Sequence, residues 1–224
     1  VRQTTAAPLR SDSARVRVES RGESAIASDA QSADGGTRYR AFFSYARADS
    51  RMAAKLHRAL DSYKVPKALQ GMPGRRGPVP ESLHPIFRDR EDLAGGGELG
   101  DRLRAALESS DALIVLCTPS SAKSHWVDEE VRLFREKRGN DSIFPVIGAG
   151  DPESDDPDIQ CMPPSLRDNT VLAADLRDIR KDTGHIIGDG PEGGRQKLLA
   201  GLLGLDLRDL GRHLHLRRLL HLRG

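Results

Sequence analysis

The chain has 224 residues, of which 30% are charged and 37% are hydrophobic, with a formal net charge of +2. This length and composition fit one soluble globular domain with tails, and so weak a basic balance argues against a nucleic-acid partner. Two cysteines, Cys117 and Cys161, are too few for a disulfide framework, and no apolar run approaches the ~18 residues of a membrane span, so we expect a cytoplasmic protein.

The two ends of the chain differ in composition from the middle. Residues 1–37 are rich in Ser, Ala, Arg and Asp, and cannot bury enough surface to offset their ordering entropy. We expect a disordered arm there, a folded domain over residues 38–210 and a basic, leucine-rich tail over 211–224. The leucine spacing near the tail fits an amphipathic segment at a membrane surface or a terminal helix packed on the domain, and we favour the helix.

Strand and helix signals alternate from the start of the folded region. The run YRAFFSY at residues 39–45 predicts a buried strand, and apolar residues at helical spacing predict a helix over 49–63. Residues 65–84 are rich in Pro and Gly, which predicts a long loop. A brief strand over 85–87 and a helix over 98–110 flank the polar, Gly-rich segment RDREDLAGGG.

The middle of the chain contains the clearest strand. The run ALIVLC at residues 112–117 is apolar on both faces, as in central strands of parallel sheets that helices cover. A helix follows over 124–137, with Ser124 placed to cap it. The run SIFPVI at 142–147 predicts another strand, in which Pro145 indicates an irregular or edge position.

Weaker signals follow toward the C-terminus. Residues 151–164 are acidic and Pro-rich and predict a loop, and residues 170–174 predict a fifth strand. The segment GDGPEGGR at 188–195 predicts a turn, and a last helix is expected over 192–203.

This alternation predicts an α/β fold, a doubly wound parallel sheet of about five strands with helices on both faces. Ligands in such folds bind at the carboxyl ends of the strands. We therefore expect residues 44–47, 88–97 and 118–121 to meet there, beside the start of the helix at Ser124.

These segments resemble the Toll/interleukin-1 receptor (TIR) family of bacterial type, whose fold is flavodoxin-like. The stretch AFFSYARAD is similar to the first strand and turn of the family, and residues 86–134 are similar to its second strand, mobile loop and catalytic helix. The loop over 65–84 resembles an insertion in one group of bacterial TIR proteins. In that group a membrane helix or a repeat domain often follows, so the resemblance implies such a continuation beyond this chain.

The resemblance implies a catalytic glutamate at Glu130, four residues after Trp126 in SHWVDEE. Residues four apart share one helix face. The nicotinamide of NAD+ is already a cationic leaving group, so one carboxylate suffices to stabilise the oxocarbenium ion, and an aromatic face can stack on the pyridinium. Without the resemblance, we interpret Glu130 as a solvated helix residue, and we interpret Asp128 and Glu129 in the same way. Trp126 is then interpreted as a packing residue.

Further candidate substrate-binding residues are Ser44, Tyr45, Arg88, Asp89 and Ser124. Arg88 and Asp89 suit contacts with either the NAD+ phosphates or a neighbouring subunit, and their alternative is a solvated charged loop. The alternative for Ser44 and Tyr45 is a plain strand end, and that for Ser124 is a helix cap. Metal sites are not expected, because the histidines and cysteines show no ligand spacing, and no cofactor is needed when NAD+ is the substrate.

Two functions remain open on the sequence. One is an NAD+ glycohydrolase in bacterial immune or stress signalling, which gives ADP-ribose or a cyclic form and is a homo-oligomer when active. The other is a non-catalytic module that recruits other TIR domains. The pair Trp126 and Glu130 favours the enzyme.

Overall fold

The computed structural model describes residues 38–88, 97–167, 173–182 and 185–212. The predicted arm over 1–37 and most of the tail lie outside the described residues, as does most of the Gly-rich segment after Arg88.

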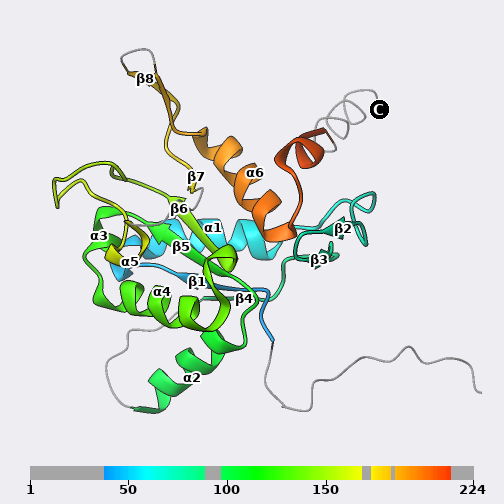
Figure 1. Cartoon of the computed structure of the whole chain (residues 1–224), viewed down its shortest axis with the longest axis horizontal. Helices are drawn as coiled ribbons and strands as arrows, with labels where there is room; N and C mark the ends of the chain where they lie inside the picture. The colour runs from blue at the N-terminus through cyan, green and yellow to red at the C-terminus, as the bar shows by residue number, and fades with distance from the viewer. Residues whose placement is uncertain (1–37, 89–96, 168–172, 183–184, 213–224) are drawn as a thin grey trace, which may run out of the picture. The chain divides into compact units, whose positions relative to one another are not determined.

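A five-stranded parallel sheet forms the centre of the domain (Figure 1), as the sequence predicted. Its strands lie in the order β4-β1-β5-β6-β7. They are β1 (Ala41–Ser44), β4 (Ile86–Arg88), β5 (Leu113–Cys117), β6 (Ile143–Ile147) and β7 (Ala174–Asp175). The apolar strand β5 pairs with β1 on one side and with β6 on the other, so its predicted central position is confirmed.

Helices cover both faces of this sheet (Figure 1). On one face lie α1 (Ser50–Asp61) and α6 (Gly190–Leu203), and on the other lie α2 (Gly97–Glu108) and α4 (His125–Arg138). Short elements connect them: η1 (Arg47–Asp49), α3 (Pro119–Ala122), η2 (Asn140–Ser142), α5 (Pro164–Arg167) and two hairpins, β2 (Pro73–Gly74) with β3 (Gly77–Pro78) and β8 (Arg180–Asp182) with β9 (His185–Ile187).

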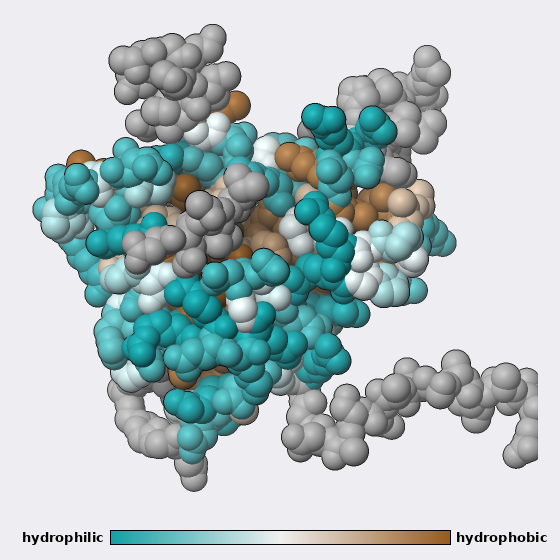
Figure 2. Space-filling model, in the orientation of Figure 1, coloured by the Kyte–Doolittle hydropathy of each residue, from teal (hydrophilic) through white to brown (hydrophobic). Residues whose placement is uncertain are grey.

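The two faces of the sheet form two hydrophobic clusters, because successive side chains of a strand point to opposite sides. In β1, Phe43 joins the cluster beneath α1 and α6, and Phe42 joins the cluster beneath α2 and α4. Both rings are 1% exposed. On the outer face seen in Figure 2, hydrophilic side chains predominate, and hydrophobic ones gather in a band across its middle.

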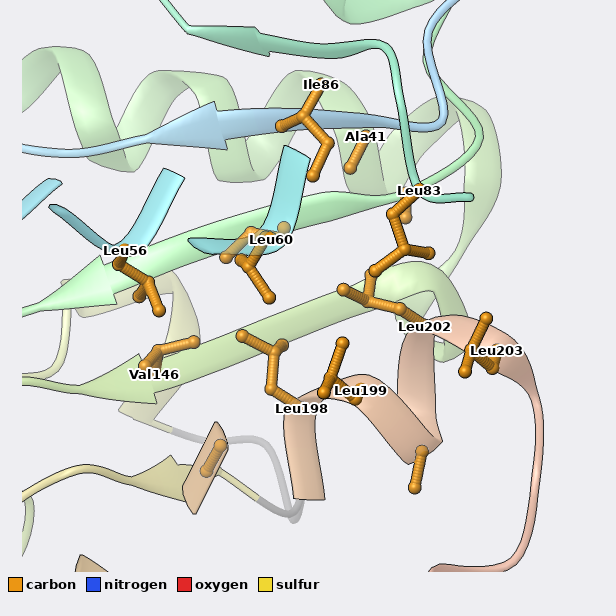
Figure 3. Packing of buried hydrophobic residues seen from close by; sticks show 14 of the residues in the cluster. Ala41, Leu56, Leu60, Leu83, Ile86, Val146, Leu198, Leu199, Leu202 and Leu203 are labelled. Carbon is orange, nitrogen blue, oxygen red and sulfur yellow. The ribbon is translucent and has the colours of Figure 1, made fainter. Parts of the chain in front are cut away.

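The segment 65–84 is more than the loop that the sequence predicted. Its residues Val65, Leu69, Val79 and Leu83 are at most 3% exposed and belong to the core cluster beneath α1 and α6. Figure 3 shows Leu83 between Ala41 of β1 and Leu202 of α6. The Pro and Gly residues that indicate a loop are therefore interleaved with residues that this domain buries.

Two other predictions about local structure were wrong. Pro145 makes its strand neither irregular nor an edge strand, since it pairs with Val115 in the regular ladder of β5 and β6, and β6 lies between β5 and β7. Among the described residues, β7 pairs with β6 only from Val146 onward. No residue of β7 lies opposite Pro145, so the N–H that proline lacks is not needed for a hydrogen bond to β7. The segment 188–195 is not a turn throughout, because α6 begins at Gly190 with Pro191 in its first turn, where proline is favoured.

Candidate functional site

The carboxyl edge of the sheet has a topological switch point between β1 and β5. From this point the chain continues through β4 to one side and through β6 and β7 to the other. Doubly wound sheets bind ligands in the crevice at such a point. Ser44 ends β1, Arg88 ends the neighbouring β4, and Thr118 follows β5, so the starts of the three segments expected to meet lie at this edge.

Glu130 lies at this switch point. The Ser44 hydroxyl donates a hydrogen bond to Oε2 of Glu130 at 2.5 Å, between residues 86 positions apart in sequence. Ser44 is 1% exposed, and Glu130 is half-buried. A charge-assisted hydrogen bond of this length fixes the orientation of the carboxylate. Glu130 is therefore not the plain solvated glutamate of the alternative interpretation.

Helix α4 sets the position of Glu130. The Ser124 side chain caps the helix by accepting a hydrogen bond from the Val127 N–H at 3.4 Å, which confirms its predicted capping position. Val127, Val131 and Phe134 are at most 2% exposed and anchor the helix on the sheet. Glu130 thus projects at the margin of a packed face, where its carboxylate is partly removed from water.

A second hydrogen bond crosses the same edge, and sequence reasoning did not single it out. Thr118 Oγ1 donates to Oδ2 of Asp49 at 2.5 Å, and Thr118 is 1% exposed. Thr118 also caps α3, in a reciprocal pair of hydrogen bonds with Ser121. The aspartate belongs to the stretch AFFSYARAD, which was noted for its resemblance to a family and not for a contact.

Tyr45 and Arg88 contact each other beside Ser44. The Arg88 Cζ atom lies 6.0 Å from the centroid of the Tyr45 ring, in a cation–π arrangement. Both residues are half-buried. The next candidate, Asp89, lies outside the described residues.

Trp126 is 68% exposed, although the sequence offered a packing role as its alternative. Its ring centroid lies 5.9 Å from that of His125. A large indole left in water at the start of α4, one turn before Glu130, is available to a ligand or to another protein.

Asp128 is not a solvated helix residue, so that interpretation was wrong. Its Oδ1 accepts a hydrogen bond from the Ser165 N–H at 2.7 Å, at the start of α5. An aspartate at this position satisfies a backbone donor that the short helix leaves open. Glu129 forms a surface pair with Arg132 at 2.9 Å.

The two cysteines serve packing. Both are 0% exposed, and burial raises the pKa of the Cys161 thiol to about 11 and that of Cys117 further still. Thiols held in the protonated form are poor nucleophiles and poor metal ligands. Within the described part of the chain, no group of three or more His, Cys, Asp or Glu residues is arranged to hold a metal ion, and no described helix is long and apolar enough to cross a membrane.

Comparison with known proteins points to one family. Residues 42–186 match the TIR domain family, which is more than half of the chain. The NAD(+) hydrolase ApTIR of Actinoplanes sp. is 30% identical over 138 residues. That alignment covers 58% of this chain and 18% of the relative, so the chain corresponds to a small part of the longer protein.

Proposed function

Because this chain belongs to the TIR domain family, we propose that it cleaves NAD+ with Glu130 as the catalytic residue. The observation that carries the proposal is the hydrogen bond from Ser44 to Glu130 at the switch point of the sheet. The similarity to a protein named as an NAD(+) hydrolase supports the substrate.

The proposed reaction needs one carboxylate. The bond between nicotinamide and C1′ of the ribose breaks, and nicotinamide leaves as a neutral molecule with the bonding electron pair. Glu130 stabilises the positive charge that develops on the ribose, since fixed charges aimed at a transition state need no reorganisation. Water then attacks C1′ and releases a proton, which gives ADP-ribose, or a hydroxyl or ring nitrogen of the same molecule attacks and gives a cyclic product.

The neighbouring residues receive supporting roles. Ser44 is too buried to line an open pocket, so it acts as a positioning residue that holds Oε2 of Glu130. Arg88 and Tyr45 offer a cation and an aromatic face beside it, and suit the phosphates and an aromatic ring of the substrate. Ser124 caps α4 and thereby stabilises the first turn of the helix that carries Glu130.

The exposed indole of Trp126 favours the second candidate function, an interaction module that recruits other TIR domains. Interfaces are enriched in tryptophan, and an indole that is 68% exposed is unusual for a residue with no partner surface. The two functions are compatible if assembly completes the catalytic site.

Incubation of the purified protein with NAD+ tests the proposal. Liquid chromatography of the mixture over time identifies nicotinamide and its partner product. Release of nicotinamide that depends on the added protein supports the enzyme. A protein that assembles but releases no nicotinamide, at high concentration and with a crowding agent, contradicts it.

A further inference from the structure

A cavity of about 830 Å³ opens at the amino edge of the sheet, at the opposite end of β1 from Glu130. It lies where β1, β4 and β6 begin, and its other walls are the β2–β3 hairpin of segment 65–84 and the C-terminal end of α6. We call it the arginine cavity, because five arginines line it. Its size is within the range of about 300–1,000 Å³ that small-molecule sites occupy.

Positive charge exceeds negative charge in this cavity. Its charged lining residues are Arg38, Arg40, Arg75, Arg76, Arg138, Asp111 and Asp141. A concave wall of one predominant sign concentrates the electric field and attracts ions of the opposite sign.

Three of these arginines have structural partners. Arg38 donates to Oδ1 of Asp111 at 2.6 Å, and Arg138 lies 3.9 Å from the same atom. Arg76 donates to backbone carbonyl oxygens of Asp111 at 2.7 Å and Asp141 at 3.2 Å. The single carboxylate of Asp111 is thus shared between two guanidinium groups.

The other two arginines have no such engagement. Arg40 and Arg75 are exposed, and within the described part of the chain neither guanidinium has a hydrogen bond or an ion pair. They belong to distant segments, the start of β1 and the β2–β3 hairpin, which the fold brings to one cavity.

Burial is the main cause that destabilises the charged form of Arg76, and repulsion by Arg138 adds to this effect. Burial lowers the pKa of Arg76, the carboxylate of Asp111 raises it, and the neighbouring Arg138 lowers it again, with a net decrease. A bound anion would relieve the repulsion among these guanidinium groups.

We propose that the arginine cavity binds a phosphate-bearing small molecule of nucleotide size, with Arg40 and Arg75 holding the phosphate oxygens. The planar guanidinium group presents two parallel N–H donors that match a phosphate, which makes arginine the usual residue for this task. The exposed ring of Pro78 and the half-buried rings of Pro80 and Phe144, which also line the cavity, offer an apolar surface for the uncharged part of the ligand.

The C-terminal end of α6 supplies the competing explanation. Helix C-termini carry partial negative charge and favour nearby arginines. The Arg75 N–H already donates to the Gly204 carbonyl at 2.9 Å, just beyond the last residue of α6. Under this explanation the arginines would stabilise the helix end and bind no ligand.

Isothermal titration at low ionic strength distinguishes the two explanations. The probes are pyrophosphate, ADP and adenosine, each titrated into the parent protein and two double variants. Arg40→Gln/Arg75→Gln removes both unengaged guanidinium groups, and Arg104→Gln/Arg208→Gln removes two exposed arginines that do not line the cavity. Thermal melting confirms that each variant is folded.

The proposal predicts that ADP or pyrophosphate binds the parent and the control variant with similar affinity. Binding to Arg40→Gln/Arg75→Gln should be at least about tenfold weaker, because a hydrogen bond to a charged group typically contributes a factor of about ten or more to affinity. Tighter binding of ADP than of pyrophosphate indicates a nucleotide, and equal binding indicates recognition of the phosphates alone. Three results overturn the proposal: no binding of either to the parent, equal loss in both variants, or a lower melting temperature of Arg40→Gln/Arg75→Gln with unchanged binding.

Discussion

Replacing Ser44 with alanine removes the hydroxyl that holds Glu130 and should reduce both stability and turnover. Hydrogen bonds to charged groups contribute about 1.5–3 kcal/mol, and Ser44 is 1% exposed, so solvent cannot replace its hydroxyl freely. We expect unfolding to become easier by about 1–3 kcal/mol. Because the carboxylate loses its fixed orientation, turnover of NAD+ should fall about tenfold or more, with a smaller change in KM.

Ser110→Ala is a matched control for this variant. Ser110 is also buried, at 0% exposed, and its hydroxyl donates to the Ala106 carbonyl at 2.7 Å, at the amino edge of the sheet. Its replacement should lower the melting temperature, by less than that of Ser44 because the acceptor is uncharged, and leave turnover unchanged. Loss of turnover in Ser110→Ala would mean that destabilisation alone explains the Ser44 result.

A double-mutant cycle shows whether Ser44 acts through Glu130. In the Glu130→Gln background, replacement of Ser44 should have little further effect on turnover, because the charged group that it orients is already gone. Steady-state rates of nicotinamide release for the four proteins give the coupling. Equal factors in both backgrounds, or an unchanged rate in Ser44→Ala alone, would refute the positioning role.

Three further predictions concern other parts of the domain. Asp128→Ala removes the acceptor of the Ser165 N–H and should lower stability by about 0.5–2 kcal/mol in thermal melts, with turnover retained. If assembly through residues 88–97 completes the site, specific activity should rise with protein concentration, and a flat rate across a wide dilution series would contradict this. Burial raises the pKa of Asp61, but hydrogen bonds from the Ile86 N–H and from His84 lower it more, with a net decrease. The stabilisation by the Asp61 carboxylate should therefore be full above about pH 4 and fade as the pH falls. In a series of urea-unfolding measurements at different pH, the Asp61→Asn variant should lack this pH-dependent component.

The elements predicted best from sequence are those with a strong local signal. The apolar run of β5 identified a central strand because only a strand covered on both faces buries every side chain. Ser124 and the apolar spacing after it located the start of α4 for an equally local reason. The position of Pro145 was misjudged because residue preference cannot show where the neighbouring strand ends.

The contacts that define the site depend on the folded chain. Ser44 and Glu130 are 86 positions apart, and no local pattern links a strand-end serine to a helix glutamate. The same holds for Thr118 with Asp49, and for Asp128 with the start of α5. The resemblance to a family identified Glu130 as a candidate, whereas its hydrogen-bond partner Ser44 was found only from the packing of α4 against the sheet.

Turnover of NAD+ by Glu130→Gln tests the central claim most directly. The change keeps size and helix propensity while it removes the charge, so the melting temperature should change little. Loss of one preorganised electrostatic group typically costs roughly 3 kcal/mol, about a hundredfold in rate. Glu136→Gln, an exposed position on the same helix, is the matched control and should cleave NAD+ like the parent. A folded Glu130→Gln protein that releases nicotinamide at the rate of an active parent would contradict the catalytic role of Glu130.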